Sequence, residues 1–313
     1  MTWNLTRRFP LPPAAAPAAE SWRNYGTRRP LHPRDAATIV LVRDGATGPE
    51  VLLTCRSPDS PLGAVSFPGG VCIPADEDPV GWFGRPLSQW SQQLGETDYG
   101  RVRRFVVAGV RELFEETGYL LAGADQFTLA EDLRGEEAIA ARQALANEDL
   151  SLAQILDRRG WGIRSDLIRP IGRWASPDFA HRRFNTHYFV AAAPPAQSCS
   201  VAEGLQSWLQ WVNVAELIQH QHTSWLGDMV NAEHTRGLNM AQITTPAVQL
   251  FCEALNRYSG SVAFLLSVFP RTAVPFLQAQ LSEGSEPELV VEFPESARDS
   301  MWATPVLSGF NEP

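Results

Sequence analysis

The segment 101–118, RVRRFVVAGVRELFEETG, constrains the fold more than any other part of this sequence. Apolar residues recur along it at the spacing of one helix face, whereas Glu112, Glu115 and Glu116 fall at i, i+3 and i+4 and project from another face. Gly118 follows as a C-cap. The pattern therefore predicts a long helix that docks on a core by its apolar side and presents stacked carboxylates with the other.

Three carboxylates on adjacent helical turns repel one another unless a counter-charge binds them. A hard divalent cation, Mg²⁺ or Mn²⁺, would supply that charge, since such ions take carboxylate oxygens and keep water for a substrate. Arg111 stands beside the glutamates and would hold one of them by a bidentate bond. The alternative is a solvated acidic face with Arg111 as its local counter-ion, because glutamate is a good helix former and is common on surfaces.

Length, hydrophobic content and net charge limit the classes of protein to which this chain can belong. With 313 residues, 44% of them hydrophobic, the chain is large enough for one elaborated domain. Its net charge of -9 argues against nucleic acid or an anionic membrane as the main partner. We expect the partner to be a small-molecule ligand, and a homodimer is possible.

The four cysteines lack any C-x-x-C spacing, so we expect them to be reduced and buried. With no cleavable signal and no apolar run of membrane-spanning length, we expect a cytoplasmic protein.

The order of elements predicts an α/β sandwich with a mixed sheet. Residues 1–33 are expected to form a leader, whose Pro/Ala-rich stretch 10–19 would be extended or poorly ordered. Two aliphatic runs joined by DGATG predict a hairpin over 36–45 and 49–57. Further strands are expected at 168–174, 183–193, 207–212 and 288–293, and further helices at 82–93, 136–160, 245–258 and 260–268.

Two separated stretches together resemble the Nudix box, G-x5-E-x7-R-E-U-x-E-E-x-G-U, of enzymes that hydrolyse nucleoside diphosphates linked to another moiety. FPGGVCIPAD (67–76) corresponds to its first half, with Asp76 where the box has glutamate, and RELFEETGY (111–119) matches each specified position of its second half. A long insertion, about 77–104, separates the halves. Surface loops tolerate such insertions, since closure entropy grows only logarithmically with length.

The resemblance implies a Nudix-type α/β/α sandwich with a mixed β-sheet, a helical insertion inside the box and extra C-terminal helices. The Nudix domain would span 34–260, with 261–313 as a C-terminal extension packed on the same domain. Glu112, Glu115 and Glu116 would hold the Mg²⁺ or Mn²⁺ ions, the Gly69 carbonyl would add a ligand, and Arg111 would orient a glutamate.

The general base is left open between two glutamates. One candidate is Glu112, on the acidic face itself. The other is Glu203, in SVAEGLQSWLQWV, because relatives supply a base or an extra ligand from a loop before their last sheet strand. The plainer interpretation of Glu203 is an ordinary loop acid.

A second resemblance concerns the substrate. LLTCRSPDSPLGAVSFPGG (52–70) is similar to the signature that precedes the box in coenzyme A diphosphatases, although the arginine of that signature between Ser57 and the Gly63 position is absent here. RDAATIVLV (34–42), RPIGRWASP (169–177) and RRFNTHYFVA (182–191) look like the Nudix motif 19 branch of those enzymes. The residues expected to contact substrate are Arg56, Ser57, Phe67, Gly70 and Arg183.

The implied reaction is attack of water on a diphosphate bridge, which for coenzyme A or acyl-CoA yields 4′-phosphopantetheine or its acyl form and 3′,5′-ADP. One alternative is the same chemistry on ADP-ribose, NADH or a nucleoside triphosphate. The other is a non-catalytic Nudix sensor, whose usual marks are a degraded acidic helix and a basic winged-helix domain. Neither mark is visible in this sequence.

Overall fold

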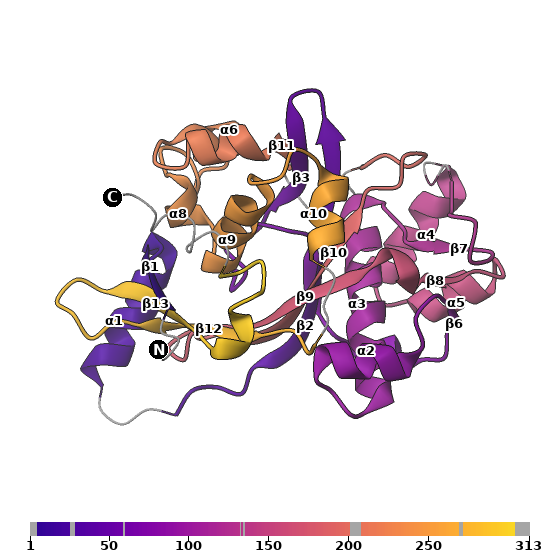
Figure 1. The fold of residues 1–313 in the computed structure, drawn as a ribbon, viewed down its shortest axis with the longest axis horizontal. Coiled ribbons are helices and arrows are strands. Elements are labelled where there is room, and N and C mark those ends of the chain that lie inside the picture. Colours follow the sequence, from indigo (N-terminus) through magenta and orange to yellow (C-terminus); the bar gives the residue numbers. More distant parts are fainter. Residues whose placement is uncertain are drawn as a thin grey trace.

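A large mixed β-sheet runs through the molecule and separates two groups of helices (Figure 1). The computed structural model describes residues 5–25, 29–58, 60–131, 133, 135–200, 208–268 and 272–303. The strand order of the main sheet is β1-β13-β12-β9-β10-β2-β3-β11, with short strands β4 and β5 paired to β3 and β2. The expected α/β sandwich with a mixed sheet is confirmed.

The predicted hairpin lies at the centre of this sheet. β2 (Arg34–Gly45) and β3 (Gly48–Cys55) pair antiparallel. β10 (Phe184–Ala192) runs parallel to β2 and antiparallel to β9 (Arg169–Ala175), and β11 (Leu209–Asn213) pairs with β3. All five strands lie where the sequence predicts them.

Alternate side chains of β2 belong to different cores, because successive residues of a strand point to opposite faces. Ile39 and Leu41 pack with α3 (Tyr99–Thr117), whereas Val40 and Val42 pack with α9 (Pro246–Leu255). The central strand is thus buried on both faces, which explains why it reads as a continuous aliphatic run rather than an alternating one.

The helices form two groups, one on each face of the main sheet (Figure 1). The group on the α3 side contains α2 (Leu87–Leu94), α4 (Glu136–Ala146) and α5 (Leu152–Asp157). The other group contains α6 (Val214–Gln219), α7 (Trp225–Val230), α8 (Met240–Ile243) and α9, and α10 (Ser261–Ser267) follows in the chain. In the described parts of the chain, no helix combines the length and apolarity needed to cross a bilayer.

The segment between the two halves of the box folds locally. A 3-10 turn (Pro74–Glu77), β6 (Gly81–Phe83) and α2 precede α3. β6 joins β8 (Gly162–Arg164) and β7 (Ala122–Gly123) in a separate sheet of order β6-β8-β7. The insertion is therefore attached to elements that lie far downstream in the sequence.

The N-terminal segment differs from the expected extended leader. β1 (Leu5–Pro10) pairs with β13 (Glu288–Phe293), and α1 (Ala16–Asn24) is a helix preceded by a 3-10 turn at Pro13–Ala15. Proline in the first helical turn and alanine after it are compatible with a helix, so the composition alone was misleading. β13 in turn pairs with β12 (Phe276–Leu281), which runs parallel to β9 and joins the chain's end to the main sheet.

Candidate active site

The helix α3 fixes the acidic residues in space. Asp98 caps its start by accepting hydrogen bonds from the backbone N–H groups of Gly100 and Arg101, and Gly118 ends it with φ of 81°. The apolar side is buried against β2, as the sequence predicts. Because packing and both caps fix the helix, the glutamates lie on a rigid element.

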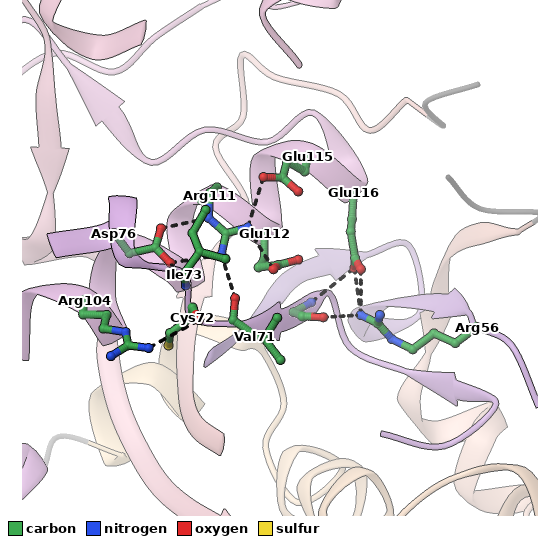
Figure 2. Close-up of polar contacts among 11 residues, drawn as sticks. Arg56, Val71, Cys72, Ile73, Asp76, Arg104, Arg111, Glu112, Glu115 and Glu116 are labelled. Atoms are coloured by element: carbon green, nitrogen blue, oxygen red, sulfur yellow. Dashed lines mark hydrogen bonds and ion pairs between the residues drawn. The ribbon is translucent and has the colours of Figure 1, made fainter. Parts of the chain in front are cut away.

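Arg111 joins the two halves of the box (Figure 2). Its Nε and Nη2 donate to Oδ1 and Oδ2 of Asp76 at 2.8 and 3.1 Å, and Nη2 also donates to the Val71 carbonyl at 2.8 Å. Its Nη1 lies 2.9 Å from Oε1 of Glu112 and 3.1 Å from Oε1 of Glu115. Despite the long insertion, the structure thus brings Asp76 to the acidic helix.

Arg56 makes a second connection, at the other end of the acidic face (Figure 2). Its Nη2 lies 2.8 and 2.9 Å from the two carboxylate oxygens of Glu116, and it donates to the Gly69 carbonyl at 2.7 Å. Nε donates to the Ser66 hydroxyl at 2.6 Å, and the Gly69 N–H donates to Glu116 at 3.2 Å. Arg56 therefore binds the Pro-Gly-Gly turn to the end of α3.

Gly70 lets the turn approach the helix closely. A Cβ placed on Gly70 would lie 2.5 Å from the Glu112 carboxylate, closer than a side chain tolerates. A side chain at this position would therefore displace the Glu112 carboxylate from its place beside the turn.

The three glutamates of the acidic face have raised pKa values, chiefly because they are buried. Burial raises the pKa of Glu115 to about 7, and the charge of Glu112 adds to the increase. Burial likewise raises the pKa of Glu116 to about 7, against the opposing effect of Arg56, and it raises the pKa of Glu112. For Arg111, burial would lower the pKa, but the hydrogen bond to Asp76 and the charge of Glu112 raise it above its ordinary value.

The charge and donor type of these residues fit a divalent cation. Ion pairs join four carboxylates, those of Asp76, Glu112, Glu115 and Glu116, to two guanidinium groups, so the paired carboxylates outnumber the guanidinium groups by two when all four acids are ionised. Oxygen ligands with this excess charge suit Mg²⁺ or Mn²⁺. Within the described ranges, no three His, Cys, Asp or Glu side chains are gathered tightly enough to hold an ion. The glutamates would have to turn from their arginines toward a common point.

The other predicted substrate residues are not gathered in one place. The Phe67 ring is 1% exposed and packs edge-to-face on Phe251, so it belongs to the core and offers the site its backbone. Arg183 is ion-paired with Asp178 and donates to the Leu31 carbonyl. Ser57 is exposed just after Arg56, and its carbonyl accepts a hydrogen bond from the Ser60 N–H. Glu203 lies outside the described residues.

Arg142 is a residue that the sequence analysis missed. From α4 it donates to the carbonyls of Glu115 and Ser200 at 2.9 and 3.1 Å, and to the Ser200 hydroxyl at 2.7 Å. It thereby holds residue 200 against the end of the acidic helix. A single arginine in a helix outside any motif gives no signal of this role.

The side chains of His187 and Trp90 are not part of the acidic cluster. His187 is buried against Phe105, and burial lowers its pKa to about 3, so the ring is neutral. Trp90, in the insertion, is fully buried and packs edge-to-face on Phe189. Both side chains serve the core.

Comparison with solved structures identifies the fold. A Nudix hydrolase from Alicyclobacillus acidocaldarius is similar at a TM-score of 0.57 and 21% identity, over 76% of this chain and 99% of that one. A MutT/Nudix family protein from Enterococcus faecalis (14% identity, 63% and 50% coverage) and the Nudix domain of Shewanella oneidensis NrtR complexed with ADP-ribose (17% identity, 64% and 86% coverage) each reach a TM-score of 0.31. No protein-family model and no curated protein matches the sequence. The chain has the fold of the Nudix hydrolases.

Proposed function

We propose that this protein is a metal-dependent Nudix hydrolase that cleaves the diphosphate bond of a nucleotide derivative, with coenzyme A and its thioesters as substrates. The observation that carries the proposal is the excess of carboxylates over guanidinium groups on the acidic face of α3. A fold adapted only for stability gains nothing from such crowding, since each buried, poorly compensated acid costs free energy.

In this proposal Glu112, Glu115, Glu116 and the Gly69 carbonyl would hold Mg²⁺ or Mn²⁺. The bound ion would neutralise charge on the diphosphate oxygens and lower the pKa of the attacking water. Arg111, which Asp76 holds in place, pairs with Glu112 and Glu115, and these two carboxylates would turn from it toward the ion. Arg56 keeps the Gly69 carbonyl beside Glu116.

The reaction forms one bond from water oxygen to phosphorus and breaks the bridging P–O bond in line with it. Its products from coenzyme A are 4′-phosphopantetheine and 3′,5′-ADP, and an acyl-CoA gives the acyl form of the first. The water's proton passes to a base, for which Glu112 and Glu203 are the candidates. The choice of coenzyme A rests on the residues 52–70 and on the resemblance stated above.

A substrate panel separates this proposal from its alternatives. The purified protein is incubated with Mg²⁺ or Mn²⁺ and coenzyme A, acyl-CoA, ADP-ribose, NADH or a nucleoside triphosphate, and products are weighed by mass spectrometry. We expect coenzyme A and its thioesters to be cleaved at the diphosphate. Faster cleavage of another nucleotide would reassign the substrate, and binding without cleavage of any of them would favour the sensor.

The first prediction concerns the metal site and carries the largest effect. Glu115→Gln with Glu116→Gln removes two anionic ligands at nearly constant shape, so kcat should fall by at least about 10³-fold while the far-ultraviolet circular dichroism is retained. The matched control is Glu137→Gln, an exposed glutamate on α4, which should keep wild-type kcat. Full turnover in the double variant would refute the assignment.

A further inference from the structure

A pocket of about 610 Å³ opens beside the strands β7 and β8. These strands and the helix α1 lie at opposite ends of the molecule's long axis (Figure 1). Three segments that are distant in the sequence form the walls, namely the turn 124–131, the stretch around Trp161, and residues 194–196. The apolar members of the lining include Ala124, Phe127, Leu129, Trp161, Pro194 and Pro195.

Phe127 lies at the rim of this pocket with its ring in solvent. It is 84% exposed, more than any other large hydrophobic residue in the described ranges. A single exposed aromatic residue is ordinary on a protein surface. One that adjoins an apolar pocket lined by tryptophan and proline forms a continuous patch, which is typical of a protein contact surface.

The turn that carries Phe127 is fixed by side-chain hydrogen bonds. Oδ1 of Asp125 accepts from the N–H groups of Phe127 and Thr128, both at 2.8 Å. Nη1 of Arg164 donates to the Thr128 carbonyl at 2.6 Å, which fastens the turn to β8. Because the backbone is already ordered, burial of the ring by a partner would cost little conformational entropy.

The other walls of the pocket are held in place as well. Nε2 of Gln197 donates to the Ala130 carbonyl at 2.7 Å and so ties the segment 194–196 to the end of the turn. The guanidinium group of Arg159 lies 5.0 Å from the ring centroid of Trp161 and covers one of its faces. The pocket is therefore formed before any partner binds.

The two sides of the pocket carry opposite charges. The turn ADQFTLAE (124–131) bears two exposed acids, Asp125 and Glu131, and no base. The facing stretch RRGWGIR (158–164) bears three arginines and no acid, and Arg158 among them is exposed. If the turn of one copy sits in the pocket of another, its acids therefore meet a basic wall.

We propose that this surface is the interface of a homodimer, in which Phe127 of each copy enters the pocket of the other. The projecting ring and the pocket adjoin on one surface, so a two-fold rotation makes both contacts at once and closes the assembly. None of these residues belongs to the acidic face of α3, so the dimer and the proposed function are tested separately.

Sedimentation equilibrium of the full chain measures the dissociation constant of the dimer. Phe127→Ser removes the ring from both contacts, so Kd should rise at least about 100-fold. Ala196→Trp fills the pocket from its exposed rim and should weaken the dimer to a similar extent. Arg158→Glu places like charges opposite the acidic turn and should raise Kd several-fold. Leu266→Ser, which removes an exposed apolar side chain on α10, is the matched control and should keep the wild-type Kd.

A mixture of two variants tests whether the ring itself enters the pocket. Phe127→Ser retains an open pocket and Ala196→Trp retains the ring, so a heterodimer of the two keeps one of the two contacts. We expect this heterodimer to form at lower concentration than the homodimer of either variant. A fluorescent label on one variant measures the mixed species, and far-ultraviolet circular dichroism checks that both variants are folded.

Three results would overturn the proposal. A wild-type chain that stays monomeric at the highest concentration reached would leave the surface to a different partner. A dimer whose Kd is unchanged by Phe127→Ser, or is weakened equally by Leu266→Ser, would place the interface elsewhere. Folded variants that associate no better when mixed than alone would show that the ring and the pocket do not meet.

Discussion

The two arginines that hold the acidic helix differ in burial and in what they connect. The Arg111 side chain is 5% exposed and its partner Asp76 1%, whereas the Arg56 and Glu116 side chains are 16% and 11% exposed. Arg111 joins α3 to the start of the insertion, and Arg56 joins it to the Pro-Gly-Gly turn. The comparison indicates that the first pair maintains the architecture, while the second is more accessible to solvent.

Breaking the buried pair gives the largest expected effect on stability. Arg111→Met leaves Asp76 without its guanidinium partner in the protein interior, so the free energy of unfolding should fall by about 3–5 kcal/mol. Urea denaturation with an unchanged m-value would measure it.

The matched control uses a more exposed pair on the same helix. Arg104 and Glu77 are 25% and 47% exposed, so Arg104→Met should cost under about 1 kcal/mol. Equal losses in the two variants would show that Arg111 has no special architectural role.

The pH dependence of stability tests whether Glu115 and Glu116 are buried acids with raised pKa values. Burial raises the pKa of both Glu115 and Glu116 from 4.5 to about 7, so between these values the folded state binds protons that the unfolded chain has released. Their contribution to stability is therefore present below the unfolded pKa and is lost as pH rises through 7.

Without divalent ions, the free energy of unfolding should fall by roughly 1–3 kcal/mol between about pH 5 and pH 8. Thermal or urea unfolding across that range measures the slope. Glu115→Gln with Glu116→Gln should flatten it, and so should added Mn²⁺, since binding to the folded state would favour the ionised carboxylates. A slope of the opposite sign would contradict the assignment of these residues as buried acids with raised pKa values.

Local patterns predicted the helix but not its connections. The apolar period and the terminal glycine are contained within residues 101–118, so α3 and its three glutamates could be placed from sequence. The pairing of Asp76 with Arg111 depends on how the insertion folds back onto the helix, which spacing does not encode. Arg142 contacts the helix from an element with no motif, so only the tertiary structure identifies it.

The N-terminal segment and the residues expected to contact substrate show the same limit of prediction from sequence. β1 depends on β13, near the other end of the chain, and such a partner cannot be inferred from a Pro/Ala-rich composition. Phe67 belongs to the motif that predicted substrate contacts. Its aromatic ring instead packs in the core against Phe251, which lies on a helix distant in the sequence. The sequence motifs predicted which segments form the candidate site. Which of their side chains a ligand can reach depends on burial, which only the tertiary structure shows.

Arg56→Lys gives a smaller expected effect than Arg111→Met and is the most direct test of the comparison between the two arginines. Lysine keeps a charge beside Glu116 but cannot maintain the fork that also reaches Ser66 and the Gly69 carbonyl. The loss of these hydrogen bonds should lower the free energy of unfolding by about 1–2 kcal/mol, less than Arg111→Met. Because the Gly69 carbonyl would no longer be held beside Glu116, the Mn²⁺ concentration for half-maximal activity should rise several-fold, with a smaller change in KM for substrate. If KM changes and the Mn²⁺ requirement does not, Arg56 contacts substrate directly, and the two arginines differ in function as well as in burial.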